Sequence, residues 1–181
     1  MGHNSYGWSV VMRDRLGLDE PVDAIEREVV AAMVARYATD PSPVIAGAVD
    51  AVLALGRRYR LALASSAHPA VIAAALRTIE LERAFEVVVA SDEVAHGKPS
   101  PDVYRLAATR LGLEPRACLV IEDSLNGVLA ARSAGMTVVL VPNGSVPPAP
   151  GAAEAADAVR ATIADIDPAA IVPAGPRETS A

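Results

Sequence analysis

Short apolar runs rich in β-branched residues alternate with amphipathic helical stretches along the chain from Val44 onward. This alternation is typical of parallel βαβ units, because two parallel strands need a crossover that a helix usually provides. The elements read αβαβαβαβ, with strands expected at 60–65, 87–91, 117–122 and 137–141. The expected helices between them span 69–81, 102–111 and 125–134. The sequence therefore predicts an α/β fold built on a parallel sheet.

Two helical stretches, 6–16 and 21–38, follow each other near the start of the chain with no strand between them. The segment Asp40-Pro41-Ser42-Pro43 is stiff and breaks helices, so it is the expected hinge between these helices and the α/β body. Exposed chain ends fray easily, so the last residues are expected to form a tail. The expected division of the chain is a helical subdomain over 1–41, an α/β body over 42–172 and a tail over 173–181.

Acidic residues outnumber basic ones 22 to 16 among the 181 residues, which gives a formal net charge of −6. Such a charge repels nucleic acids and anionic membranes, so neither is expected as a partner. No apolar run approaches the roughly 18 residues that a membrane helix needs, and the N-terminus lacks the layout of a secretory signal. The single cysteine, Cys118, excludes a disulfide framework. Together these features predict a cytoplasmic protein.

Ser65 ends the first expected strand, and Ser66 follows it in the turn before a helix. In a parallel α/β sheet, ligands bind where strand C-termini meet helix N-termini, because backbone N–H groups and helix dipoles converge there on anions. A serine hydroxyl and the amides that follow it could therefore hold a phosphate group. The alternative is that Ser65 serves only as a turn or N-cap residue.

Two adjacent carboxylates, Glu122 and Asp123, stand at the end of the third expected strand. They repel each other unless a cation or a positively charged side chain lies between them, and hard oxygen ligands of this kind suit Mg²⁺. The alternative is that Asp123 or Ser124 caps the following helix while Glu122 points to solvent.

Lysine occurs once in the chain, as Lys98, and the other basic residues are all arginine. Lys98 lies in the loop His96-Gly97-Lys98-Pro99-Ser100-Pro101, directly before an expected helix. At that place its charge could reach a phosphoryl oxygen. The alternative is an ordinary surface lysine.

The strings LALASSA, GKPSPDVY and VIEDSLNGVLAARSAGM carry these candidate residues in order along the chain. They resemble the second, third and fourth motifs of the haloacid dehalogenase superfamily, within its beta-phosphoglucomutase-like phosphatase group. The resemblance extends over nearly the whole chain, since the two helices before the hinge look like the helical cap of that family. It implies a Rossmann-like parallel sheet with a partial N-terminal helical cap.

The resemblance also implies Mg²⁺-dependent phosphoryl transfer on a small phosphorylated metabolite. It implies that the substrate phosphate is held by Ser65, Ser66 and Lys98, with Ser65 and Lys98 also acting in catalysis. The implied Mg²⁺ ligands are Glu122 and Asp123. A metal and a lysine supply the electrostatic stabilisation that such transfer requires. Hydrolysis is the expected reaction, because mutase activity depends on how a cap excludes water.

The nucleophile of that family is the first aspartate of an Asp-x-Asp-Gly motif after an N-terminal strand, and this chain has no such motif. The only Asp-x-Asp, Asp165-Ile166-Asp167, is followed by Pro168 and coincides with the variable C-terminal helix of the family. We therefore assign no nucleophile in this chain and expect the first, central strand of the family's sheet to be missing. The strands that end at Ser65 and Glu122 would then either close up or keep unpaired edges.

A misplaced start or a truncated product would explain this departure, with the intact protein a working enzyme. The alternative hypothesis is a catalytically inactive, truncated fragment that only binds phosphate or metal, and a third is an inert remnant. A dinucleotide-binding fold is set aside, because no expected strand is followed by Gly-x-Gly-x-x-Gly. We interpret His3, His68 and His96 as structural or solvent-exposed.

Overall fold

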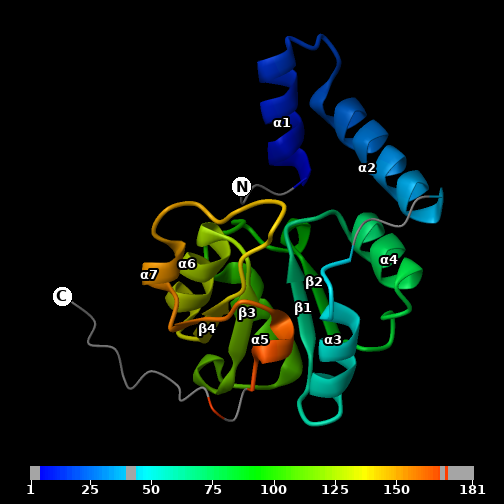
Figure 1. Cartoon of the computed structure of the whole chain (residues 1–181). Coiled ribbons are helices and arrows are strands. Elements are labelled where there is room, and N and C mark those ends of the chain that lie inside the picture. The colour runs from blue at the N-terminus through cyan, green and yellow to red at the C-terminus, as the bar shows by residue number, and fades with distance from the viewer. Residues whose placement is uncertain (1–4, 40–43, 168–169, 171–181) are drawn as a thin grey trace.

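The computed structural model describes residues 5–39, 44–167 and 170, and its helices and strands alternate as the sequence predicts (Figure 1). The α-helices are α1 (Ser5–Leu16), α2 (Val22–Thr39), α3 (Ala48–Gly56), α4 (Pro69–Thr78), α5 (Asp102–Leu111), α6 (Leu125–Ala134) and α7 (Ala152–Ala155). The strands are β1 (Ala62–Ser65), β2 (Val87–Ala90), β3 (Leu119–Glu122), β4 (Thr137–Leu140) and β5 (Ala158–Val159). Single 3₁₀ turns form η1 (Ser91–Glu93), η2 (Pro115–Ala117) and η3 (Ile163–Asp165). The predicted α/β fold is confirmed.

Local capping explains why α5 and α6 have the predicted bounds. The Ser124 hydroxyl accepts a hydrogen bond from the Gly127 amide at the start of α6, at 3.1 Å. Gly112 and Gly135 end the two helices with φ of 65° and 82°, a conformation that glycine adopts without strain. The sequence predicted that the helix over 69–81 ends at residue 81, and this end is wrong, because α4 ends at Thr78.

Two of the short elements that follow the last predicted strand are η3 and β5. Ile163–Asp165, at the place where the resemblance puts the variable C-terminal helix of the family, forms one 3₁₀ turn. The Asp165 carboxylate accepts a hydrogen bond from the Thr162 amide at 3.1 Å, which closes this short turn. The short strand β5, which pairs with β4, was not predicted, because two residues carry no periodic signal.

The strands form two separate parallel sheets rather than one. The first pairs β1 with β2, from Ala62 opposite Val87 to Ser65 opposite Ala90. The second has the order β3-β4-β5, with Glu122 opposite Leu140 at the end of β3. Within the described residues, β1 and β3 belong to different sheets, so these strands have not closed up. Their facing edges are those where a central strand was expected to be missing.

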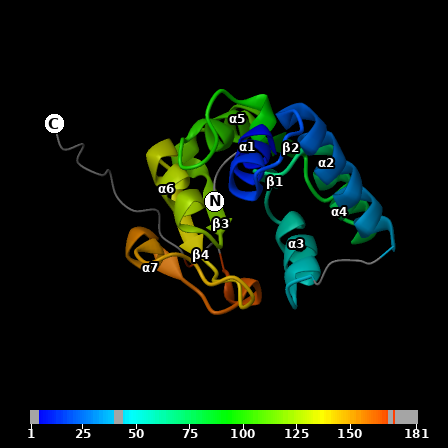
Figure 2. The same ribbon diagram turned by 90° about the horizontal axis from the view of Figure 1, so that it is seen from above.

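One hydrophobic core nevertheless spans both sheets on the side of α5 and α6 (Figure 2). Val89, Val120 and Val138 from β2, β3 and β4 pack there with Val103 of α5 and Val128 of α6. The opposite face carries two distinct clusters, one between the first sheet and α3–α4 and one between the second sheet and η3. The apolar core is therefore continuous across the two sheets on this face only, while on the opposite face α3 and η3 are in contact.

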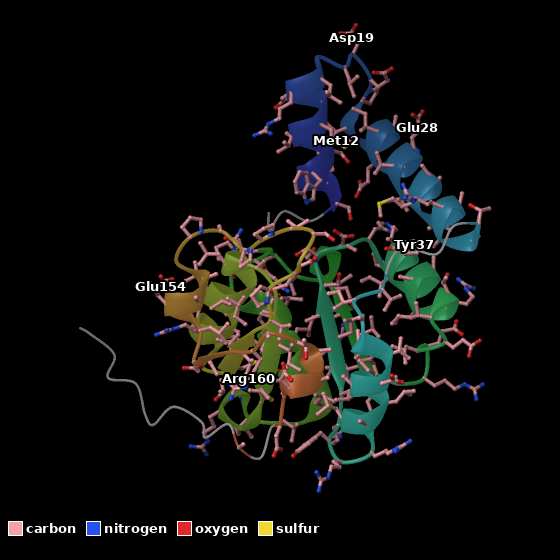
Figure 3. All side chains as sticks on the ribbon, viewed as in Figure 1. Met12, Asp19, Glu28, Tyr37, Glu154 and Arg160 are labelled. Atoms are coloured by element: carbon pink, nitrogen blue, oxygen red, sulfur yellow. The ribbon has the colours of Figure 1, made fainter. Side chains whose placement is uncertain are left out.

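Helices α1 and α2 stand beside the α/β body as an antiparallel pair (Figure 1). Figure 3 shows Asp19 at the turn farthest from the body and Tyr37 at the end of α2 nearest α4. The Thr78 hydroxyl donates to the Tyr37 carbonyl oxygen at 3.0 Å, and the Asp92 carboxylate accepts hydrogen bonds from the Ser5 amide and hydroxyl. These contacts attach the helical pair to the body at the start of α1 and near the end of α2.

The expected hinge at residues 40–43 and the expected tail at residues 173–181 lie outside the described residues. The division of the chain at residues 41 and 42 therefore stays a prediction. Among the described helices, none combines the length and the apolar character required to cross a membrane. The cytoplasmic location stays a prediction.

Candidate active site

The side chain of Lys98 links the C-terminal ends of the two sheets. Its ammonium group donates to the carbonyl oxygen of Ala64 on β1 at 3.3 Å and to Oε1 of Glu122 on β3 at 2.5 Å. The two side chains are only 9% and 8% exposed. The two alternatives, a surface role for Lys98 and a solvent-facing Glu122, are therefore both excluded.

The carboxylate of Glu122 is surrounded by hydrogen-bond donors. Oε1 accepts from Lys98 and from the Tyr104 hydroxyl, while Oε2 accepts from the amides of Asp123 and Ser124 and from the Ser124 hydroxyl. Burial by itself raises the pKa of this carboxyl, but the Lys98 charge and the hydrogen bonds together lower the pKa below its ordinary value. Glu122 is therefore held as a buried anion.

Lys98 resolves the repulsion that the sequence predicts between Glu122 and Asp123, since its positive charge lies against one of them. Ser124 caps α6, as one of the alternatives proposed, yet it does so while Glu122 stays buried. The capping interpretation and the charged-site interpretation therefore hold at the same time.

Tyr104, in the first turns of α5, belongs to the same cluster and was missed by sequence reasoning. Its hydroxyl donates to Glu122 Oε1 at 2.7 Å, and its ring centroid lies 4.8 Å from the Lys98 ammonium. Tyr104 is 5% exposed, and burial followed by the Glu122 charge raises the pKa of its phenol well above the ordinary value. The spacing from Lys98 to Tyr104 placed the tyrosine inside the following helix but gave no sign of its contact with Glu122.

Gly127 provides the space that the Glu122 carboxylate occupies. A Cβ atom at Gly127 would overlap the carboxylate carbon and both of its oxygens. Gly127 is buried in the first turn of α6, where its amide also donates to Ser124. The sequence showed a glycine inside a helix without a reason for it, and the reason is this close approach.

Ser65 ends β1 and Ser66 follows it, and their hydrogen bonds are to other parts of the chain. The Ser65 hydroxyl accepts from the Ala67 amide at 3.1 Å, which is the turn role that sequence offered as an alternative. The carbonyl oxygen of Ser66 accepts from the Ser91 hydroxyl at 3.2 Å. Lys98 contacts Ala64, the residue directly before Ser65, so the serines and the ammonium group share one end of the sheet.

The residues at this site fit a magnesium ion only in part. Asp123 is exposed and presents the kind of oxygen ligand that Mg²⁺ prefers. Both oxygens of Glu122 already accept protein hydrogen bonds, one of them from an ammonium group. No group of three or more His, Cys, Asp or Glu side chains that could hold a metal ion occurs in the part of the chain that the structure describes.

The histidines lie in structural or surface positions where the structure describes them. His68 caps α4, because its Nδ1 atom accepts a hydrogen bond from the Ala70 amide at 3.1 Å. His96 is exposed and lies 3.0 Å from the Asp102 carboxylate. The hydrogen bond from Ser100, and then that from His96, lower the pKa of Asp102. His3 lies outside the described residues.

A cavity of about 460 Å³ lies elsewhere, between α3 and η3. It is lined by Asp50, Arg58 and Tyr59 on one side and by Ile163 and Asp167 on the other. None of the predicted site residues lines this cavity. The cavity lies on the face of the sheets that is opposite α5 and α6, where α3 of one apolar cluster meets η3 of the other. We assign the cavity no role in the site.

Known proteins identify the class to which this arrangement belongs. Residues 5–135 match the family model described as haloacid dehalogenase-like hydrolase. The matched segment includes Ser65, Lys98, Glu122 and Asp123 together with both N-terminal helices. The chain therefore belongs to the haloacid dehalogenase-like hydrolase family, as its motifs predicted.

Individual relatives share parts of the chain. CbbY of Rhodobacter capsulatus is 43% identical over 102 residues, which are 56% of this chain and 45% of CbbY. Fructose-1-phosphate phosphatase YqaB of Escherichia coli is 41% identical over 91 residues, which are 50% of this chain and 48% of YqaB. The chain thus spans about half the length of these curated relatives.

Solved structures agree with this assignment. The crystal structure of CbbY from Rhodobacter sphaeroides in complex with phosphate has a TM-score of 0.72 to this chain at 30% sequence identity. The match covers 82% of this chain and 67% of that one. The beta-phosphoglucomutase of Clostridium difficile, at 17% identity and a TM-score of 0.73, supports the fold alone.

Proposed function

We propose that this protein acts in the hydrolysis of small phosphorylated metabolites, with the substrate phosphate held at the C-terminal ends of β1 and β3. The observation that carries the proposal is the buried Lys98 ammonium, held between the ends of both sheets. Among the described residues the ammonium donates to Ala64 and Glu122, and an ammonium group has three donors, so one remains for an oxygen of a phosphate group. Fructose-1-phosphate phosphatase YqaB and the phosphate complex of CbbY support the same class of ligand.

Lys98 would stabilise the negative charge that develops on the transferring phosphoryl group. Ser65 and Ser66 lie one and two residues after Ala64, whose carbonyl oxygen holds the ammonium, so their hydroxyls and amides can approach the same anion. The N-terminus of α4 follows them and adds its dipole. We propose Ser65, Ser66 and Lys98 as the phosphate-binding residues, with Ser65 and Lys98 also catalytic.

We propose Mg²⁺ as the cofactor, held chiefly through Asp123. When bound, such an ion neutralises charge on the phosphoryl oxygens and orients them. Mg²⁺ often uses one or two carboxylates and takes its remaining ligands from substrate and water, so a single exposed Asp123 is a sufficient anchor. Glu122 stays a predicted second ligand, and its present role is to hold Lys98.

The nucleophile is not assigned to any described residue. Asp165 is engaged with Thr162, and Asp167 lines the cavity beside α3. The competing function is therefore a protein that binds phosphate or metal without turnover. The separation of β1 and β3 into two sheets favours this second candidate for the chain by itself, because the ends of those strands frame the site.

Turnover and binding separate the two functions. The chain is incubated with p-nitrophenyl phosphate and Mg²⁺, and its affinity for inorganic phosphate is measured by calorimetry. Hydrolysis that falls about a hundredfold or more in Lys98→Ala and Asp123→Ala would support the enzyme. Phosphate binding that Lys98→Ala abolishes, without hydrolysis, would support the binding protein.

The exposed Arg83→Ala serves as the matched control, because it removes one positive charge away from the named site residues. It should leave both hydrolysis and phosphate binding within about twofold of the wild type, since exposed charges contribute little. Absence of both activities in the wild-type chain would contradict the proposed function.

A further inference from the structure

We propose that Tyr104 is a positioning residue of this site, whose hydroxyl fixes the orientation of the Lys98 ammonium through the Glu122 carboxylate. The inference deepens the proposed function and rests on it for the role of the oriented ammonium. No motif-based assignment above gives Tyr104 any role.

Two contacts of different kinds carry this proposal. The Tyr104 hydroxyl donates to Glu122 Oε1 at 2.7 Å, the same oxygen that accepts from Lys98. The face of the ring lies 4.8 Å from the Lys98 ammonium, within the range of a cation–π contact. Tyr104 thus touches both members of the ion pair, once through its hydroxyl and once through its ring.

The sharing of Oε1 gives the hydroxyl its effect. A carboxylate oxygen that accepts only from a flexible lysine leaves the carboxylate free to turn, whereas a second donor on a buried ring restricts it. The Ser124 donors hold Oε2, so the Tyr104 hydroxyl completes the fixation of the carboxylate plane. Lys98 is then oriented by Glu122 and can still be shared with a phosphate group.

Burial makes the contact specific. Tyr104 is 5% exposed, so its hydroxyl requires a partner within the protein, and the partner found is Glu122. A phenylalanine would fill the same space beside Val103 and Ala107 in the core without fixing the carboxylate. The hydroxyl can therefore be tested separately from the packing of the ring.

The single lysine makes the experiment selective. Incorporation of lysine labelled with ¹³C at Cε yields one NMR signal, which belongs to Lys98. In the wild type, the Cε methylene protons should be shifted upfield by the Tyr104 ring and should be inequivalent, because the ammonium is held in place. In Tyr104→Phe the ring remains, so the upfield shift should persist in part while the two proton signals merge. In Tyr104→Leu both features should disappear.

Phosphate titration then links orientation to binding. We expect inorganic phosphate to bind about tenfold more weakly to Tyr104→Phe than to the wild type, the change expected from one hydrogen bond to a charged group. Tyr59→Phe, which removes a hydroxyl from the exposed Tyr59 at the cavity beside α3, is the matched control. It should change neither the lysine signal nor the affinity.

The outcomes separate the inference from the proposed function. An unchanged lysine signal in Tyr104→Phe overturns the inference, and so does a changed signal with wild-type phosphate affinity. A wild-type lysine signal that does not respond to phosphate contradicts the proposed function instead, and the spectra without phosphate then decide the inference alone. Urea unfolding of each variant tests whether the core is intact. Tyr104→Phe should be more stable than Tyr104→Leu, because the phenyl ring keeps the packing of the core.

Discussion

Replacement of Gly127 by alanine tests how tightly the site is built. The new Cβ would overlap the Glu122 carboxylate, so the carboxylate must leave its place. Overfilling a packed site costs about 1–3 kcal/mol. Displacement also weakens the hydrogen bonds to Oε2, and one hydrogen bond to a charged group contributes about 1.5–3 kcal/mol. Alanine favours the helix over glycine by about 1 kcal/mol, which offsets part of this cost. The expected net decrease in the free energy of unfolding is about 3 kcal/mol.

Urea unfolding followed by circular dichroism measures this loss. Gly56→Ala is the matched control, because Gly56 also belongs to an α-helix, as the last residue of α3, and its added Cβ would meet only Leu61 at 3.4 Å. That variant should be as stable as the wild type or slightly more stable. A Gly127→Ala protein of wild-type stability would refute the reasoning.

A double-mutant cycle isolates the cause. With Glu122→Ala in place, the carboxylate is gone and the Cβ at position 127 has room. The second substitution should then cost little, which gives a coupling free energy of about 2 kcal/mol or more between the two positions. Additive effects would mean that the cost arises from the helix and not from the carboxylate.

Two further variants test other parts of the structure. Asp92→Ala should release the start of α1, because it removes both hydrogen bonds to Ser5, and hydrogen exchange should then rise in α1 while α5 and α6 keep their protection. Glu93→Gln tests the pH dependence of stability. The hydrogen bond from the Ala90 amide and then that from Arg110 lower the pKa of Glu93, so its contribution is complete above its unfolded pKa of about 4.3. That contribution is lost as the pH falls through the folded pKa. The unfolding free energies of wild type and variant are measured by urea unfolding from neutral to acid pH, and they should converge in acid. A difference that stays constant with pH would contradict this expectation.

Much of the fold followed from local pattern. The alternation of apolar runs and amphipathic stretches predicted β1 to β4 and the helices between them, because period and capping are short-range properties. The bounds of α5 and α6 were correct because Ser124, Gly112 and Gly135 act within a single turn. The short β5 was missed, because two residues owe their strand conformation to pairing with β4.

The candidate site followed from the sequence only as a set of positions. The strings around Ser65, Lys98 and Glu122 predicted that these residues serve one chemistry, and the structure brings Lys98 against Glu122 and beside β1. The phosphate and metal roles remain proposals. Tyr104 and Gly127 could not be chosen beforehand, because a helical tyrosine usually fills a core and a glycine has no side chain to indicate its neighbour.

The sequence by itself determined the alternation of strands and helices, the family and the residue types available for chemistry, since these depend on short-range pattern and on identity. Only the tertiary structure decided that Glu122 is buried with five donors, that Tyr104 shares its oxygen with Lys98 and that Gly127 leaves room for the carboxylate. It also decided that β1 and β3 lie in different sheets. The physical reason is that burial and charge pairing arise between residues distant in sequence, and no local period records them.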